Sequence, residues 1–171
     1  MAKRVIRPIR IEGNVAYVPL TRGREAVIDA ADVHLIKGYA WRISAARGRF
    51  YAVTCLPRNG QKQKSIWMHR TILPPTEGVI VDHIDGDGLN NRRANLRLAT
   101  VSQSMCNAKM RSDNSSGYRG VAFVRAENKW AAYITVQKKR LSLGRFDTAE
   151  SAHDAYVAAS AKYHGDYGRT S

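Results

Sequence analysis

The chain has 171 residues, with 28 Lys and Arg against 14 Asp and Glu, so its formal net charge at pH 7 is +14. The hydrophobic fraction of 44% is ordinary for a globular protein and excludes wholesale disorder. No apolar run reaches the length of a membrane span, and no secretory signal follows the charged N-terminus, so we expect a cytoplasmic protein. The two cysteines, Cys55 and Cys106, form no C-x-x-C pair and are too few to build a four-cysteine zinc site.

Half of the net charge lies in residues 109–145, which contain nine basic and two acidic residues. Such an excess favours a polyanionic partner. A membrane surface would require a basic amphipathic helix, whereas this segment has the pattern of strands. We therefore expect a nucleic acid as the partner, and no membrane.

Residues 1–66 are predicted to be β-rich, because short runs of β-branched and aromatic residues alternate with Gly and Asn. The predicted elements are strands at 15–20, 49–53 and 64–69, one or two helical turns at 32–37, and a turn with a basic tip at 57–62.

The middle of the chain predicts a hairpin followed by a helix. The apolar run 79–81 ends in Asp82 and His83, residues 85–88 form a turn, and residues 96–99 resume an extended segment. Thr100 or Ser102 can cap the helix that follows.

Small polar residues at 112–117 predict a linker in front of a compact C-terminal unit. The predicted elements are strands at 118–125, 129–137 and 139–146 and a helix that is capped by Asp147 or Thr148 and ends at Gly165. One helical face is expected to be buried: Ala149, Ala152, Tyr156, Ala159 and Tyr163.

Asp82 and His83 are candidate functional residues, because a hydrophobic strand delivers two ionisable side chains to its end. An EF-hand is a competing interpretation of residues 85–88. It would place His83 and Ala94 where Asp and a bidentate Glu are required, so it fails. We interpret the acidic residues of this loop as turn residues.

The segment from Trp67 to Arg111 resembles the HNH nuclease family, most closely the phage and intron-encoded homing endonucleases. The resemblance rests on His69-Arg70 and on the nineteen consecutive positions from Asp82 to Thr100. It implies a ββα-metal core in which Asp82 binds Mg²⁺ or another divalent cation such as Mn²⁺. By the same resemblance His83 is the general base, and Asn95 orients the histidine and its loop. His69 is interpreted as a structural or phosphate-contacting residue, and the expected DNA contacts of the core are Arg92, Arg93 and Arg97.

One position departs from the family pattern. The last metal ligand of the family is usually His or Asn, four residues after the threonine that matches Thr100, where this chain has Ser104. A hydroxyl is a weaker ligand, and Asn107 lies three residues further on the same helical face as the alternative. A non-catalytic, sequence-preferring DNA-binding protein derived from an HNH nuclease is therefore the alternative function.

Residues 116–168 resemble the plant Apetala-two/ethylene-response-factor domain, on the landmarks Tyr118–Val121, Lys129–Ile134 and Leu143–Ala152. The resemblance implies a sheet that lies in the DNA major groove and is braced by a helix. Alternation directs one set of side chains toward the helix: Val121, Phe123, Trp130, Ala132, Ile134, Val136, Leu141 and Leu143. The opposite face and its margins carry the predicted DNA contacts: Arg119, Arg125, Lys129, Tyr133, Thr135, Lys138, Lys139 and Arg140.

The sequence thus predicts an α+β protein with a β-rich region at 1–66, an HNH core at 67–112 and an Apetala-two-like three-stranded antiparallel sheet on one helix at 113–171. The predicted function is metal-dependent hydrolysis of phosphodiester bonds in double-stranded DNA, of the homing type, in the host cytoplasm if a phage encodes the chain. A structured-RNA binder is a third interpretation. It is disfavoured because the major groove of A-form RNA is too narrow for a sheet.

Overall fold

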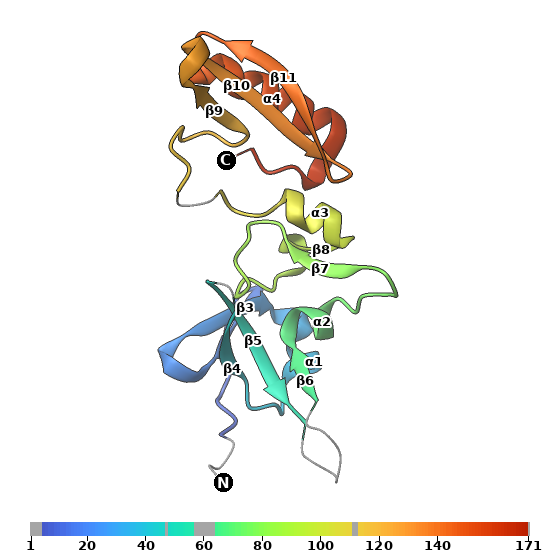
Figure 1. The fold of residues 1–171 in the computed structure, drawn as a ribbon. Helices are drawn as coiled ribbons and strands as arrows, with labels where there is room; N and C mark the ends of the chain where they lie inside the picture. Colours follow the sequence, from blue (N-terminus) through green and yellow to red (C-terminus); the bar gives the residue numbers. More distant parts are fainter. Residues whose placement is uncertain (1–4, 47, 57–63, 111–112, 171) are drawn as a thin grey trace. The chain divides into compact units, whose positions relative to one another are not determined.

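The computed structural model describes residues 5–46, 48–56, 64–110 and 113–170 (Figure 1). Small antiparallel sheets are combined with helices, as expected for an α+β protein. Internal packing divides the chain into two compact units, Met1–Ala99 and Thr100–Ser171, which are considered separately below. In the described part of the chain, every helix is too short or too polar to span a bilayer.

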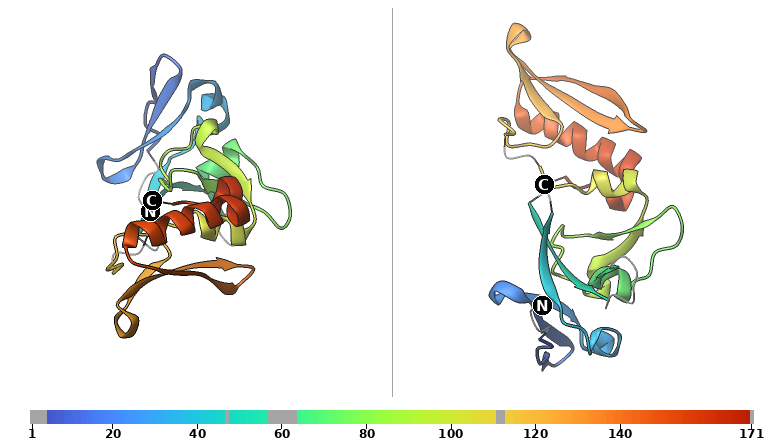
Figure 2. Two further views of the ribbon diagram at one scale, coloured as in Figure 1. Left: turned by 90° about the horizontal axis from the view of Figure 1, so that it is seen from above. Right: turned by 60° about the horizontal axis from the view of Figure 1, so that its bottom comes forward.

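The first unit is built mainly from short antiparallel strands (Figures 1 and 2). One sheet contains β1 (Arg10–Glu12), β2 (Val15–Pro19) and β3 (Glu25–Asp29), another contains β4 (Arg42–Ala46), β5 (Arg49–Cys55) and β6 (Ser65–Trp67), and β7 (Ile80–His83) pairs with β8 (Leu96–Ala99). The helices are α1 (Val33–Ile36) and α2 (Met68–Ile72), with 3₁₀ turns at Thr21–Gly23, Ala30–Asp32 and Arg93–Asn95. The predicted strands at 15–20 and 49–53 and the helical turn at 32–37 are confirmed, and the turn at 57–62 lies outside the described residues.

The predicted strand at 64–69 is wrong in its second half. Only Ser65–Trp67 is extended, and His69 lies in α2, where Met68 and Ile72 are both buried. The spacing of four between these two residues is helical, and so short an apolar run fits either period.

One hydrophobic core runs through the whole first unit. Its buried members come from β2, β3, α1, β5, α2, β7 and the segment around β8: Ala16, Val18, Leu20, Ala26, Ile28, Ile36, Trp41, Ala52, Met68, Ile72, Val81, Leu89 and Leu96. Each fully buried Ile, Leu or Met side chain contributes about 1.5–3 kcal/mol. The predicted boundary at residue 66 therefore does not coincide with a break in packing, and the three-part domain division stays a prediction.

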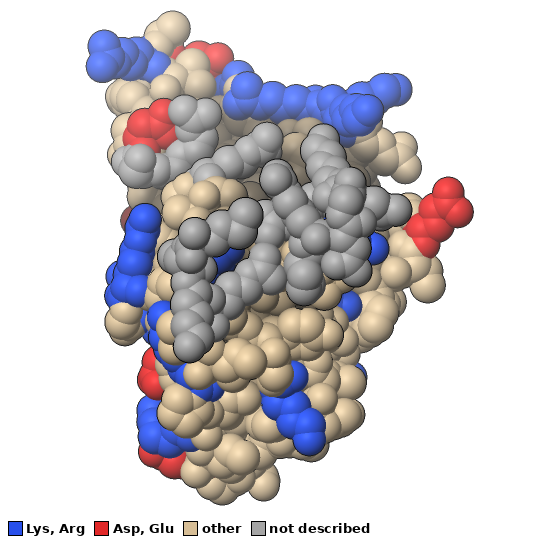
Figure 3. Space-filling model, turned by 90° about the horizontal axis from the view of Figure 1, so that it is seen from below, with Lys and Arg blue, Asp and Glu red and all other residues tan. Residues whose placement is uncertain are grey.

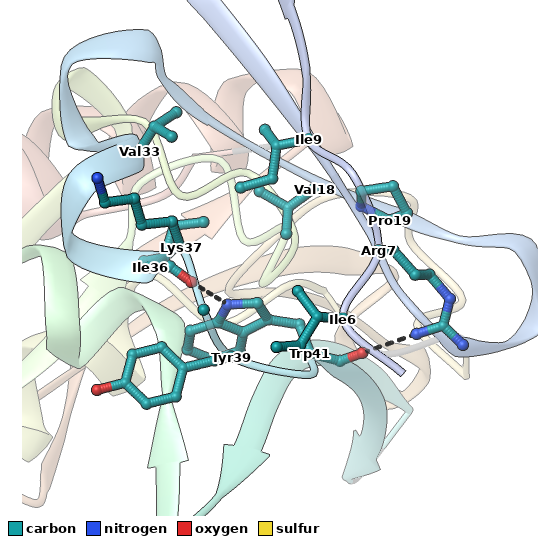
Figure 4. A pocket seen from close by; sticks show the side chains of 11 residues that line it. Ile6, Arg7, Ile9, Val18, Pro19, Val33, Ile36, Lys37, Tyr39 and Trp41 are labelled. Carbon is teal, nitrogen blue, oxygen red and sulfur yellow. Dashed lines mark hydrogen bonds between the residues drawn. The ribbon is translucent and has the colours of Figure 1, made fainter. Parts of the chain in front are cut away.

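A pocket of about 270 Å³ opens beside Trp41 in the first unit (Figure 4). The indole N–H of Trp41 donates to the Ile36 carbonyl at 2.9 Å, and Arg7 Nη1 donates to the Trp41 carbonyl at 3.4 Å. The described residues that line the pocket are mainly aliphatic and include no Asp, Glu, His or Cys. The pocket therefore offers no acid–base pair for catalysis.

The second unit begins with α3 (Val101–Cys106), which Thr100 caps. The Thr100 hydroxyl accepts from the Gln103 backbone N–H and the Gln103 side chain accepts from the Thr100 N–H, a complete capping box. Thr100 rather than Ser102 is thus the cap. The predicted linker is a hydrogen-bonded turn where the structure describes it, because the Asn114 carboxamide oxygen accepts from the backbone N–H groups of Ser116 and Gly117.

A three-stranded antiparallel sheet and one helix complete the second unit. The strands are β9 (Val121–Val124), β10 (Lys129–Val136) and β11 (Lys139–Phe146) in the order β11-β10-β9, and α4 (Ala149–His164) lies across one face of the sheet (Figure 2). Short 3₁₀ turns at Arg125–Glu127 and Gly165–Tyr167 follow β9 and α4. Thr148 caps α4 through the Ser151 N–H, and Gly165 ends it, both as predicted.

The helix face is buried as predicted at Ala149, Ala152, Tyr156 and Ala159, which pack on the sheet. Three further residues that were assigned to the buried side remain substantially exposed: Tyr163 (44%), Phe123 (45%) and Leu141 (36%). Tyr163 and Phe123 are each the last but one residue of their element. The predicted buried face is therefore too long at these positions.

Candidate active site

Strand β7 carries Asp82 and His83 at its C-terminal end, and both side chains are 6% exposed. The antiparallel register places Asp82 opposite Arg97 and His83 opposite Leu96 on β8. The predicted delivery of two adjacent ionisable residues to the end of an apolar strand is therefore present in the structure.

The His83 imidazole is oriented by Asn91, which is fully buried. His83 Nε2 lies 3.3 Å from Asn91 Oδ1, and Asn91 Nδ2 donates to the Leu89 carbonyl at 3.0 Å. Because the second bond turns the amide oxygen toward the histidine, Nε2 has to carry the proton in the neutral ring, which leaves the lone pair on Nδ1. Asn91 was not among the predicted site residues, although its place in the Asn-rich loop after the Asp-Gly turn was a usable signal.

Asn95 holds the loop rather than the histidine itself. Its Oδ1 accepts from the Asp85 N–H at 3.0 Å, and its Nδ2 donates to Asp85 Oδ1 at 2.9 Å and to the Asn90 carbonyl at 2.8 Å. Its backbone carbonyl accepts from the Ile84 N–H at 2.9 Å. These bonds close the loop between β7 and β8, so its contact with His83 is indirect.

The N-terminal sheet supports the same loop from the other side. The Val27 N–H of β3 donates to the Leu89 carbonyl at 2.9 Å, and the Asn91 N–H donates to the Val27 carbonyl at 2.7 Å. Both bonds lie next to the amide that orients His83. The residues before position 67 are therefore part of the scaffold of this site.

The three arginines predicted to bind DNA near the site are engaged in ion pairs within the first unit. Arg92 Nε lies 2.9 Å from Asp29, Arg93 donates Nε and Nη2 to Asp32 at 2.8–3.0 Å, and Arg97 donates Nε and Nη2 to Asp82 Oδ2 at 3.0 Å each. On the face drawn in Figure 3, basic side chains are likewise scattered, and several adjoin acidic ones. DNA contact by these three arginines stays a prediction.

Four rings pack together around His83. Its ring centroid is 5.1 Å from that of His69, in an edge-on arrangement, and 6.1 Å from that of Tyr51. Trp67 lies 5.6 Å from Tyr51 and 6.0 Å from His69. His69 is 6% exposed, so it is a buried member of this cluster.

Burial sets the protonation of both histidines. Burial lowers the pKa of His69 to about 3, and electrostatic interaction with the neighbouring His83 and Arg70 adds to the effect. Burial also lowers the pKa of His83, while the hydrogen bond to Asn91 and the charges of Asp85 and Asp82 oppose that shift. Both rings are thus neutral at cellular pH, which is the state in which an imidazole can accept a proton.

Asp82 can bind a hard divalent cation only if that cation needs few ligands from the protein. Among the residues that the structure describes, no three His, Cys, Asp or Glu side chains gather as a metal site. Mg²⁺ commonly uses one or two carboxylates and completes its shell with water and substrate phosphates, so the Asp82 carboxylate fits that role. Arg97 pairs with the same carboxylate and would have to share it.

Ser104 and Asn107, the other predicted metal ligands, belong to the second unit. Ser104 lies in α3, and Asn107 is the C-cap residue of that helix, 6% exposed. Their role as ligands stays a prediction.

The outward face of the C-terminal sheet presents an aromatic residue with arginines stacked on it. The Arg140 guanidinium lies 3.8 Å from the Tyr133 ring centroid, and that of Arg145 lies 5.7 Å from it. Register places Thr135 opposite Arg140 and Ala131 opposite Arg145, so these side chains share the face that α4 leaves uncovered. Arg145 was not among the predicted DNA contacts, because β11 has a bulge opposite Ala132 and Tyr133 that shifts its alternation.

The remaining predicted DNA contacts have different surroundings. Arg119 is half-buried beside Tyr156 of α4 and donates to the Ala108 carbonyl, so it is not on the outward face. Lys129 pairs with Asp147, and Arg125 is exposed in the turn after β9. Lys138 and Lys139 are exposed at the β10–β11 hairpin, where Gln137 and Lys138 both have positive φ.

Comparison with known proteins identifies the middle of the chain. The model of the HNH endonuclease family matches residues 67–106. Protein 3.8 of Escherichia phage T7 is 30% identical over 96 residues, which cover 56% of this chain and 78% of that protein. The uncharacterized HNH endonuclease L560 of Acanthamoeba polyphaga mimivirus is 33% identical over 89 residues, 52% of this chain and 45% of that protein.

A plant protein matches a shorter stretch. The AP2-like ethylene-responsive transcription factor TOE2 of Arabidopsis thaliana is 45% identical over 51 residues, which are 30% of this chain and 10% of that protein. No solved structure matches the chain significantly. By its coverage of the phage protein and the match of its middle segment, the chain belongs to the family of Protein 3.8 of Escherichia phage T7 and carries an HNH endonuclease domain.

Proposed function

We propose that the protein is a divalent-metal-dependent endonuclease of the homing type that hydrolyses phosphodiester bonds in duplex DNA, with His83 as the general base. The observation that carries the proposal is the buried, neutral His83 at the end of β7, whose Nε2 is engaged by Asn91. The family of the segment 67–106 supports nuclease chemistry and does not favour the non-catalytic alternative.

The proposed reaction begins with a water molecule near Nδ1 of His83. Nδ1 takes a proton from this water as its oxygen attacks the scissile phosphorus, and the bond to the 3′-oxygen breaks. The 3′-oxygen leaves as an alkoxide and takes a proton from solvent water, so the products carry 5′-phosphate and 3′-hydroxyl ends. Asn91 keeps the Nε2–H tautomer, and Asn95 keeps the loop closed around the base.

Asp82 is the proposed ligand for Mg²⁺ or Mn²⁺, with Ser104 or Asn107 as predicted further ligands. Such a cation, when bound, offsets the charge on the phosphate and on the leaving oxygen. Arg97 holds the Asp82 carboxylate in place through its Nε and Nη2.

The C-terminal sheet is the proposed DNA-docking element, in the manner of an Apetala-two-like domain. The stack of Arg140 and Arg145 on Tyr133 supports this part of the proposal, because it presents guanidinium groups on an uncovered, exposed face. Arginine can pair with guanine edges or with phosphates.

Relaxation of supercoiled plasmid with Mg²⁺, with and without excess EDTA, tests the function. His83→Ala is expected to lower the cleavage rate by about 10²–10⁴-fold, because the general base is lost. DNA affinity should stay within about twofold, since the base activates water and adds little to docking. Undiminished nicking by His83→Ala, or full activity in EDTA, would contradict the mechanism.

A further inference from the structure

Strand β5 brings Tyr51 to the general base from outside the segment that the HNH family model covers. The family match begins at residue 67. The Tyr51 ring centroid lies 6.1 Å from that of His83, 5.9 Å from that of His69 and 5.6 Å from that of Trp67. The tyrosine is thus in contact with every other ring of the cluster.

The active-site loop also packs directly on Tyr51. A Cβ atom at Gly88 would lie 2.3 Å from the Phe50 carbonyl oxygen and 2.5 Å from Cδ1 of Tyr51. No side chain fits between them, so Gly88 is required for this close approach. Tyr51 is therefore in contact both with the loop that carries Asn91 and with the two histidine rings.

The hydrogen bond to Asn91 holds the His83 ring at one nitrogen, and it is a long bond. Its length is 3.3 Å, whereas such bonds are usually near 2.9–3.0 Å. A half-buried aromatic neighbour in ring contact, such as Tyr51, restricts rotation of the imidazole, and a general base has to keep its lone pair aimed at the water.

We propose that Tyr51 is a positioning residue that holds the His83 imidazole in its reactive orientation, an inference that rests on the proposed nuclease function. The ring of Tyr51 performs this task, and its hydroxyl is not needed. The N-terminal β-rich region is then part of the active site as well as part of the fold.

Tyr51→Leu removes the ring, Tyr51→Phe keeps it, and Tyr39→Leu is the matched control. Tyr39 lies in the same unit against Trp41, in the pocket of Figure 4, and faces no catalytic residue. With plasmid DNA and Mg²⁺, Tyr51→Leu is expected to lower kcat by about 10- to 100-fold with KM changed less than threefold, since misplacement by about 1 Å has effects of that size. Tyr51→Phe and Tyr39→Leu should keep wild-type kcat.

Loss of kcat in Tyr51→Phe would overturn the proposal, because it would assign the effect to the hydroxyl. Equal loss in Tyr39→Leu would overturn it too, because it would show general destabilisation. Wild-type kcat in Tyr51→Leu would show that the ring does not position the base.

Nitrogen-15 NMR of the histidine rings provides a readout that needs neither metal nor DNA. The His83 signal is assigned as the one that is absent from His83→Ala. In wild type it should show the Nε2–H tautomer, and in Tyr51→Leu it should show a mixture of tautomers. Tyr51→Phe should match wild type. If this NMR pattern is found but wild type does not cleave DNA, the nuclease function fails and the positioning by Tyr51 stands. A pure Nε2–H tautomer in Tyr51→Leu would refute the positioning itself.

Discussion

Two groups of arginines in this protein lie in different electrostatic surroundings. Arg92, Arg93 and Arg97 flank the active-site loop, and each pairs with an aspartate of the first unit. Arg140 and Arg145 lie on an exposed sheet face against the ring of Tyr133. Arg145 also pairs with Glu127, whereas Arg140 has no carboxylate partner among the described residues. A compensated charge has less to gain from a phosphate, so the first group supports the loop, and in the second group Arg140 is the better placed to meet DNA.

The strongest test of this contrast is the double variant Arg140→Gln and Arg145→Gln. We expect duplex-DNA affinity to fall by about 10- to 100-fold. The plot of log affinity against log salt concentration should also become less steep, by about one unit of slope for each arginine that contacts a phosphate. Fluorescence anisotropy over a range of salt concentrations measures both quantities. Lys162→Gln, on the exposed side of α4, is the control. An unchanged salt slope in the double variant would remove the sheet face from the DNA interface.

Arg93→Gln tests the other half of the comparison. Asp32 is 3% exposed, and the variant leaves its carboxylate without the guanidinium that donates to both oxygens. We expect the free energy of unfolding to fall by about 1–3 kcal/mol, as for other charge-assisted hydrogen bonds to a buried group. Urea unfolding measures it. A stable Arg93→Gln variant with weakened DNA binding would show instead that Arg93 belongs to the DNA-contacting group.

The buried histidines should make the first unit sensitive to acid. The pKa of His69 is about 3 in the folded protein and near 6.5 in the unfolded chain, so the unfolded chain binds more protons below pH 6.5. Stability is then fully present above pH 6.5 and is lost as the pH falls toward 3, by about 2 kcal/mol between pH 7 and pH 5. Urea unfolding at both pH values checks this, and His69→Gln should remove most of the difference. An equal loss in His69→Gln would assign the acid sensitivity to another group.

The smallest expected effect is that of Ser104→Asn, at the position where the chain departs from the HNH pattern. If the Ser104 hydroxyl is a metal ligand, Ser104→Asn should lower the half-saturating Mg²⁺ concentration for cleavage several-fold, because an amide oxygen binds better. If Asn107 has the role, Ser104→Asn should have little effect and Asn107→Ala should abolish cleavage. Mg²⁺ titrations of wild type and both variants distinguish the two cases. The same titration curve in all three proteins would exclude both residues as ligands.

Local patterns predicted much of the fold. The alternation in β10, the capping by Thr100 and Thr148 and the stop at Gly165 all depend on neighbours in the sequence, and the structure has them. Short segments were less certain, as His69 shows, because three to five residues fit a strand or a helix equally well. Asp82 and His83 were found for the same local reason, since they end an apolar strand.

What the sequence by itself determined is the pair at the end of β7 and the elements that deliver it. Only the tertiary structure decided which groups surround that pair: Asn91 on Nε2 of His83, Val27 on the loop, and Tyr51 on the ring. It also decided that Arg93 meets Asp32, sixty-one residues away along the chain. Pairings over such distances depend on how sheets pack and register, and no local spacing encodes them.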